Sequence, residues 1–164
     1  MGRLLLIYYR HPSILCLVDK MRTGHIAWDA TQVWERLWLG GLSDAEKLAE
    51  GNPHCITTVV SLSEIPVENK RRGICYLHLA VEDAEPVPVR QFDAIMDALS
   101  ENIRWGTVLL HCSLGISRAP SMAAAYMAAC GYRGIDAAIK EIRQMRPFIS
   151  PSNILLNSLK EHLQ

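Results

Sequence analysis

The sequence lacks an excess of charge of either sign. Its 164 residues include 17 basic and 17 acidic side chains, which cancel. No polybasic tract stands out from the rest of the chain. Nucleic acids and anionic membrane surfaces attract proteins with a net positive charge or a clustered basic patch. We therefore expect no nucleic acid and no membrane among the partners of this chain.

Long apolar runs and a cysteine framework are also missing. The apolar run of residues 4–9 is too brief for a signal-peptide core or a membrane span. The five cysteines are an odd number and have none of the spacings typical of a disulfide-stapled secreted fold. They indicate reduced thiols in the core and a cytoplasmic location, with a nuclear location also compatible.

Repeats and low-complexity linkers are absent too, which indicates a single domain. Strands that alternate with helices are typical of an α/β fold, so we expect a central, mostly parallel (mixed) sheet flanked by helices. Residues 1–25 are the least informative part and are interpreted as an N-terminal extension or hairpin of unclear role. From apolar and β-branched runs and from helical spacing, we expect strands at residues 33–40, 56–62, 74–80 and 107–110, and helices at residues 43–50, 92–103, 117–130 and 135–145, with a last one after Ser150 as its N-cap.

The chain is organised around residues 107–122. A short apolar strand is followed by a tight loop, in which Gly115 can take a positive φ angle, and by a helix start marked by Pro120. Such a loop turns successive backbone N–H groups inward and puts a helix N-terminus behind them. The sequence therefore predicts a cradle for an oxyanion, opened by Cys112 and closed by Arg118.

Cys112 and Arg118 supply complementary chemistry on this loop. A thiol among aligned N–H dipoles and beside a guanidinium is stabilised as the nucleophilic thiolate. The guanidinium of Arg118 can hold two phosphate oxygens at once. Cys16 and Arg22 have the same spacing, but they lack a preceding histidine and a glycine within the loop. We therefore assign the nucleophile and the phosphate clamp to Cys112 and Arg118.

The pattern His-Cys-x-x-Gly-x-x-Arg at residues 111–118 resembles the signature of the cysteine-based protein tyrosine phosphatases. The strands expected at residues 33–40 and 56–62 resemble strands of the compact dual-specificity branch of this superfamily. The resemblance implies a protein tyrosine phosphatase-like fold, with the catalytic domain at residues 26–164. It also implies that Cys112 forms a phosphocysteine intermediate and that no metal or cofactor takes part.

The resemblance further assigns the residues around the phosphate. Backbone N–H groups of the loop hold the phosphate oxygens together with Arg118, and His111 orients the loop beside the nucleophile. The phosphate-binding residues are thus expected to be Ser113, Leu114, Gly115, Ile116, Ser117 and Arg118.

Phosphomonoester hydrolysis also needs an acid, because the leaving alkoxide or phenoxide must be protonated. The candidates are Glu82, Asp83 and Glu85, which follow the strand expected at residues 74–80. Their positions in the sequence leave all three open. The resemblance to the family's acid loop, which precedes a helix containing Phe92, implies Asp83.

One residue departs from the family's pattern. In the family, a serine or threonine usually follows the arginine. Its hydroxyl donates a hydrogen bond to the cysteine thiolate when the phosphocysteine is hydrolysed in the second step of the reaction. This chain has Ala119 at that position. A lost hydrogen bond to a charged group is worth about 1.5–3 kcal/mol, roughly ten- to a hundred-fold in rate. We expect slow hydrolysis of the phosphoenzyme unless Ser113, Ser117 or a water takes over this role.

We therefore expect a phosphatase of phosphorylated protein substrates, with phosphotyrosine and phosphoserine/phosphothreonine both within its range. The first alternative keeps the chemistry on a non-protein phosphomonoester, such as a phosphoinositide, an RNA 5′ end or a sugar phosphate. Against it, the variable loop positions 113, 114, 116 and 117 offer no lysine to a more anionic substrate. The second alternative is a pseudophosphatase that binds phosphoproteins without turnover, and only Ala119 supports it.

Overall fold

The computed structural model describes residues 29–164. The hairpin predicted within residues 1–25 and the pair Cys16 and Arg22 lie outside these described residues. Within residues 29–164, no helix combines the length and the apolar composition that crossing a membrane requires.

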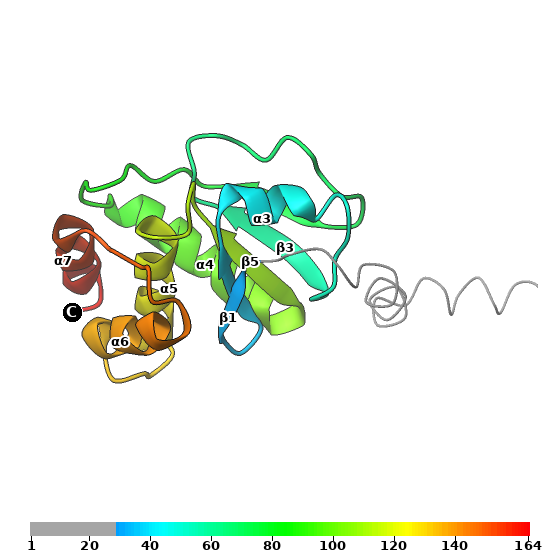
Figure 1. The fold of residues 1–164 in the computed structure, drawn as a ribbon. Helices are drawn as coiled ribbons and strands as arrows, with labels where there is room; N and C mark the ends of the chain where they lie inside the picture. The colour runs from blue at the N-terminus through cyan, green and yellow to red at the C-terminus, as the bar shows by residue number, and fades with distance from the viewer. Residues whose placement is uncertain (1–28) are drawn as a thin grey trace, which may run out of the picture.

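A five-stranded sheet forms the centre of the structure (Figure 1), with the order β1-β2-β5-β3-β4. β1 pairs antiparallel with β2, and the other pairings are all parallel. This topology confirms the predicted α/β fold with a mostly parallel, mixed sheet. The strands are β1 (Thr31–Trp34), β2 (Leu37–Gly40), β3 (Ile56–Ser61), β4 (Cys75–His78) and β5 (Thr107–His111).

The single strand predicted at residues 33–40 is wrong, because the chain forms a hairpin there. The turn between β1 and β2 contains Arg36, whose φ of 57° lies in the left-handed region. That conformation is uncommon for a residue with a side chain and reverses the direction of the chain. Val33, Leu37 and Leu39 are all buried on either side of the turn. Their apolar alternation continues across it, so the pattern gave no sign of two strands.

Helices cover both faces of the sheet. α3 (Leu42–Lys47) lies on one face, where it packs with Leu109 and other apolar residues of the strands. The neighbours Val108 and Leu110 face the opposite side and join a larger core. Figure 1 shows α5, α6 and α7 grouped on that side, away from α3. The helices of this second face are α4 (Val89–Trp105), α5 (Arg118–Ala129), α6 (Ile135–Met145) and α7 (Asn153–His162).

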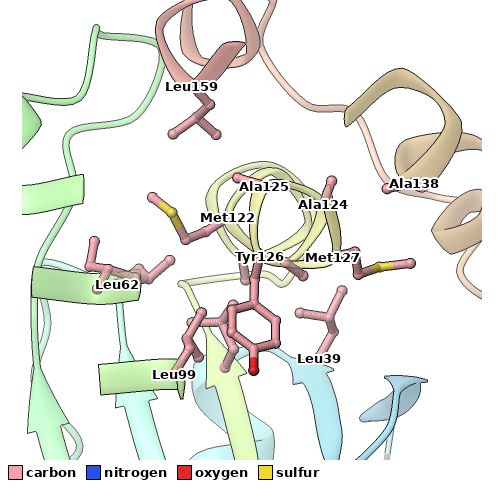
Figure 2. Packing of buried hydrophobic residues seen from close by; sticks show 14 of the residues in the cluster. Leu39, Leu62, Leu99, Met122, Ala124, Ala125, Tyr126, Met127, Ala138 and Leu159 are labelled. Carbon is pink, nitrogen blue, oxygen red and sulfur yellow. The ribbon is translucent and has the colours of Figure 1, made fainter. Parts of the chain in front are cut away.

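α5 is enclosed by the rest of the fold. Every residue from its first, Arg118, to Met127 is buried. Figure 2 shows α5 end-on above the sheet, with Leu99 of α4, Ala138 of α6 and Leu159 of α7 around it. Alanines at positions 123, 124 and 125 have no exposed surface, and their small size allows the close helix–sheet packing that the sequence predicts.

The start of α3 differs from the prediction. Ser43 is expected as the N-cap, but the cap is Gly41. The buried carboxylate of Asp44 reaches back and accepts the Gly41 N–H at 2.9 Å. An acidic side chain three residues after the cap satisfies one of the unpaired N–H groups of a helix start. The helix therefore begins earlier than its serine indicates.

The last helix also starts at a different residue. Its N-cap is Ser152, and not Ser150 as predicted. The N–H of Ser150 donates to the carbonyl of Ile116 at 2.9 Å, so this residue belongs to a loop contact and not to the helix. Leu155 and Leu159 are buried as predicted, whereas Leu163, also expected in the core, is 38% exposed.

The cysteines differ from one another. Cys75, Cys112 and Cys130 have free thiols, as predicted, but Cys75 and Cys130 are exposed and not in the core. Cys55 is disulfide-bonded, so the prediction of reduced thiols is wrong for this residue. Spacing along the chain does not reveal which cysteines the fold brings together, and this is why the pattern failed here.

Candidate active site

The loop of residues 112–117 connects β5, the central strand, to the start of α5. It lies at the carboxyl edge of the parallel strands, where open α/β sheets bind ligands. Gly115 has a φ of 70°. A side-chain carbon added to it would lie 2.6 Å from the carbonyl oxygen of Gly40 at the end of β2. Both the backbone conformation and the close approach of β2 therefore require glycine at this position.

Three backbone hydrogen bonds fix this loop to its surroundings. The Leu42 N–H, at the start of α3, donates to the Ser113 carbonyl at 3.0 Å, and the Ser150 N–H donates to the Ile116 carbonyl at 2.9 Å. The Leu62 N–H donates to the carbonyl of His111, just before the loop, at 2.8 Å. The loop is thus held from both faces of the sheet.

Cys112 lines a cavity of about 400 Å³ and is only 2% exposed. Its position at the end of β5 and before α5 follows from the strand–loop–helix pattern of the sequence. The cavity brings together the predicted nucleophile, the predicted acid, most of the predicted phosphate-binding residues and the segment before α7. Its lining residues are Asp83, Ala84, Cys112, Ser113, Leu114, Ile116, Ser117, Arg118, Ser150, Pro151 and Ser152.

The side chain of Arg118 crosses under the loop. Its Nη1 donates to Glu64 Oε1 at 2.6 Å and to the carbonyls of Leu62 at 3.3 Å and Val81 at 3.0 Å. Its Nη2 donates to Ser113 Oγ at 2.9 Å. Its Nε is buried and has no hydrogen-bond partner within the described part of the chain. Nε and Nη2 form one edge of the guanidinium, and this edge fits two oxygens of a phosphate.

Glu64 is a residue of the site that the sequence analysis missed. It forms an ion pair with Arg118, in which the arginine side chain is 7% exposed and the glutamate 55%. The hydrogen bond from Arg118 holds the pKa of the Glu64 carboxyl below its ordinary value. Burial lowers the pKa of Arg118, but the hydrogen bond that it donates to Glu64 and the charges of Cys112 and Glu64 outweigh this effect and raise that pKa. Glu64 follows the end of β3, so the carboxyl edge of the sheet was the signal that could have identified it.

Asp83 also lines the cavity. Its Oδ1 accepts a hydrogen bond from Ser117 Oγ at 2.8 Å and one from the Ala84 N–H at 3.0 Å. Ala84 has a φ of 59°, which makes a tight turn that directs the acid loop toward the cradle. The competing acids, Glu82 and Glu85, are exposed and do not line the cavity.

His111 is fully buried at the end of β5. Its Nδ1–H donates to the carbonyl of the next residue, Cys112, at 3.2 Å. Burial lowers the pKa of His111, which favours the neutral imidazole. Its Nε2 has no hydrogen-bond partner among the described residues. A neutral, enclosed ring of this kind can orient the start of the loop.

Ala119, at the position where the family usually has a hydroxyl, is completely buried. Ser113 Oγ accepts from Arg118 and lies 3.2 Å from Ser63 Oγ, while Ser117 Oγ donates to the predicted acid. In residues 29–164 no hydroxyl forms a hydrogen bond with the Cys112 sulfur. Both serines that the sequence offered as substitutes thus have other partners.

Metal-ligating side chains do not gather at this loop. Among the residues that the structure describes, no three His, Cys, Asp or Glu side chains come close enough together to hold a metal ion.

Residues 37–164 match the sequence model of the family described as "Dual specificity phosphatase, catalytic domain". The chain belongs to this family. The match begins at β2 and includes the whole loop, Asp83 and every helix described above.

Named relatives of this family cover most of the chain. It is 28% identical over 135 residues to a probable dual specificity protein phosphatase of Dictyostelium discoideum, which is 82% of this chain and 63% of that relative. It is 29% identical over 133 residues to dual specificity protein phosphatase 15 of Rattus norvegicus, covering 80% and 56%. The chain therefore spans less than two thirds of the length of either relative.

Solved structures of the family share its fold. The crystal structure of DUSP15 superposes with a TM-score of 0.72 at 28% identity, covering 80% of this chain and 85% of that one. The human tyrosine phosphatase-like serine/threonine/tyrosine-interacting protein gives the same TM-score of 0.72 at 24% identity, covering 82% and 95%. At that lower identity the likeness concerns the fold alone.

Proposed function

We propose that this chain hydrolyses phosphomonoesters of proteins through a phosphocysteine intermediate. One observation carries the proposal: Arg118 and Cys112 line a single cavity, and the Nε of Arg118, which has no hydrogen-bond partner among residues 29–164, forms one edge of the guanidinium with Nη2. Membership of the dual-specificity phosphatase family supports the same chemistry. The catalytic unit we propose is the one predicted at residues 26–164, with residues 1–25 as an extension outside it.

In the first step the Cys112 thiolate attacks phosphorus, and a sulfur–phosphorus bond forms as the ester bond breaks. Asp83, in its protonated form, gives its proton to the leaving oxygen. The product is the free alcohol or phenol of the substrate, and phosphate stays on Cys112. The position of Asp83 on the cavity wall supports this role over Glu82 and Glu85.

In the second step a water attacks the phosphocysteine. The Asp83 carboxylate, left without its proton, takes a proton from that water while the water oxygen bonds to phosphorus. The sulfur–phosphorus bond breaks, inorganic phosphate leaves and Cys112 returns to the thiolate. Asp83 is again protonated, so the cycle needs no metal and no cofactor.

The equatorial oxygens of the phosphate carry the charge that both steps must stabilise. The N–H groups of residues 113–118 and the Nε–Nη2 edge of Arg118 are assigned to these oxygens, as an oxyanion hole. Glu64 and the carbonyls that bind Nη1 keep the guanidinium in place. His111 is assigned a positioning role through its bond to the Cys112 carbonyl.

The choice of protein substrates rests on charge. Among the described residues that line the cavity, Arg118 is the one basic side chain. A phosphoinositide or another polyanion carries further phosphates that would need their own cationic partners. A phosphorylated protein side chain needs a single phosphate site, and both phosphotyrosine and phosphoserine/phosphothreonine meet that condition. The cytoplasmic location stays a prediction, and the disulfide at Cys55 weakens its basis.

A substrate panel tests the proposal. p-Nitrophenyl phosphate, a phosphotyrosine peptide, a phosphothreonine peptide of the same sequence and a phosphoinositide are given to the native chain and to Cys112→Ser. Cys130→Ser removes an exposed thiol and serves as the matched control. We expect peptide hydrolysis by the native and control proteins and none by Cys112→Ser. Preference for the phosphoinositide would favour the non-protein alternative, and tight peptide binding without turnover would favour the pseudophosphatase.

A further inference from the structure

A second hollow lies beside the catalytic cavity. Its volume is about 440 Å³, and its walls come from the phosphate loop, from the end of α6 and the segment after it, and from Asp29 and the start of β1. Leu114 and Ile116 line both hollows and so form the ridge between them. We call this second hollow the side groove. Its lining residues are Asp29, Thr31, Leu114, Gly115, Ile116, Met145, Arg146, Pro147, Phe148 and Ile149.

Large apolar side chains of the side groove are unusually exposed. Phe148 is 87% exposed, Leu114 72% and Met145 37%. Neighbouring exposed apolar side chains around a hollow are a mark of an interaction site, whereas single ones scattered over a surface are not. These residues thus offer an apolar contact directly next to the place where the phosphate binds.

The two charged side chains that the structure describes in the side groove, Arg146 and Asp29, are paired with each other. The side chain of Arg146, the one basic residue among the described lining residues, is 9% exposed. The same guanidinium donates to Thr31 Oγ1 at 3.1 Å and to the Leu39 carbonyl at 3.4 Å. Both Nη nitrogens of Arg146 therefore have partners within the protein. A second phosphate or an acidic side chain would lose its hydration here without gaining a new partner, whereas an apolar side chain has no such desolvation cost.

The side groove is also preformed. The bond from the Ser150 N–H to the Ile116 carbonyl holds the segment after α6 against the phosphate loop. Gly115 keeps the loop close to β2. A ligand that enters this groove does not have to order it first, so the apolar contact contributes fully to binding.

We propose that the side groove binds an apolar side chain of the phosphoprotein substrate, close in sequence to the phosphorylated residue. This inference rests on the proposed function and specifies its substrate. A peptide whose phosphate lies over Cys112 must continue across the rim of the cavity. Where it crosses the Leu114 ridge, its next side chains face Phe148 and Met145. The apolar, charge-neutral lining selects leucine-like over acidic residues at that position.

The test uses phosphotyrosine peptides that differ at one residue, with leucine, serine or aspartate on either side of the phosphotyrosine. kcat/KM is measured for the full chain, for Phe148→Ser and for Trp105→Ser. Trp105, at the end of α4, is 82% exposed and lies outside the groove, so it is a matched control for loss of an exposed aromatic. p-Nitrophenyl phosphate, which is too small to reach the groove, reports the catalytic centre alone.

We expect the native chain to prefer a leucine peptide by about tenfold, mostly through KM, as is typical of a shallow apolar contact. Phe148→Ser should lose this preference, Trp105→Ser should keep it, and all three should hydrolyse p-nitrophenyl phosphate equally. A native chain without the preference, or a Phe148→Ser variant that keeps it, overturns the proposal. So does a Phe148→Ser variant that changes from dimer to monomer in sedimentation, because a second copy would then occupy the groove.

Failure of the proposed function gives a different result. If none of the three proteins hydrolyses p-nitrophenyl phosphate, the catalytic assignment is wrong. Peptide binding to the Cys112→Ser variant is then measured by calorimetry. Tighter binding of the leucine peptide to Cys112→Ser than to the double variant with Phe148→Ser still supports the groove. Equal binding refutes it.

Discussion

Replacing Ala119 by serine should speed the second half of the reaction. Ala119 has no exposed surface and lies in the first turn of α5, directly after the phosphate clamp. The nearby hydroxyls of Ser113 and Ser117 are bonded to Arg118 and Asp83. The thiolate that leaves phosphorus thus receives no hydroxyl donor from the described residues.

The size of the effect follows from the missing bond. A hydrogen bond to a charged group contributes about 1.5–3 kcal/mol, which corresponds to roughly ten- to a hundred-fold in rate. The native chain should release one equivalent of nitrophenol in a rapid burst from p-nitrophenyl phosphate and then turn over slowly. Ala119→Ser should keep the burst rate and raise the slow phase by about ten- to a hundred-fold.

Rapid-mix absorbance measurements separate the two phases. Ala123→Ser, one turn further along α5 and equally buried, controls for the cost of placing a hydroxyl inside this helix. A linear time course in the native chain would refute the reasoning, since it would mean that hydrolysis of the phosphoenzyme is not the slow step. An unchanged slow phase in a folded Ala119→Ser protein would refute it as well.

Three further substitutions test other parts of the site. Glu64→Gln should lower kcat/KM about tenfold by loosening Arg118. Because the pKa of Glu64 is lowered in the fold, its stabilising effect is present at neutral pH and is lost as the pH falls through that pKa. The unfolding free energies of the native and variant proteins should therefore converge in acid, and a constant difference between them would contradict the ion pair. Asp83→Asn should lower kcat about a hundredfold or more on phosphotyrosine peptides and less on p-nitrophenyl phosphate, whose leaving group needs less protonation; equal losses on both substrates would argue against an acid role. Gly115→Ala should weaken the binding of inorganic phosphate and lower the melting temperature, because the added carbon meets a backbone oxygen at 2.6 Å. The control Gly73→Ala has a φ of 87° but nothing within 4 Å of the added carbon, so it should show only the conformational cost. Equal effects of the two substitutions would exclude a steric clash at Gly115.

The parts of the site that lie on one continuous stretch were predictable from the sequence. Residues 107–118 encode a strand, a glycine turn and a helix start, and local preferences decide all three. Asp83 required the family resemblance, because three acids in one loop have the same local preference. Glu64 was missed although its place after β3 marked it as a candidate, because its pairing with Arg118 joins distant parts of the chain. The side groove was not predictable, since it depends on the α6–α7 segment reaching the same loop.

The fold as a whole followed from periodicity, and its errors have local causes. The hairpin at Arg36 was hidden because Val33, Leu37 and Leu39 keep the same alternation on both sides of the turn. α7 starts after Ser152, while Ser150 contacts the phosphate loop through its N–H. Local pattern alone does not distinguish two neighbouring serines that are both able to cap a helix.

The enclosure of α5 has a consequence for how ligand binding and folding are linked. Residues 118–127 of this helix are all buried, so we expect their amide protons to exchange with solvent mainly through unfolding of the whole domain. The first turn of this same helix carries Arg118, the proposed phosphate clamp. An oxyanion held there binds the native state alone, so it stabilises the protein by an amount that grows with the logarithm of its concentration relative to its Kd. The phosphate concentration in the surroundings thus becomes one of the quantities that determine the stability of the folded chain.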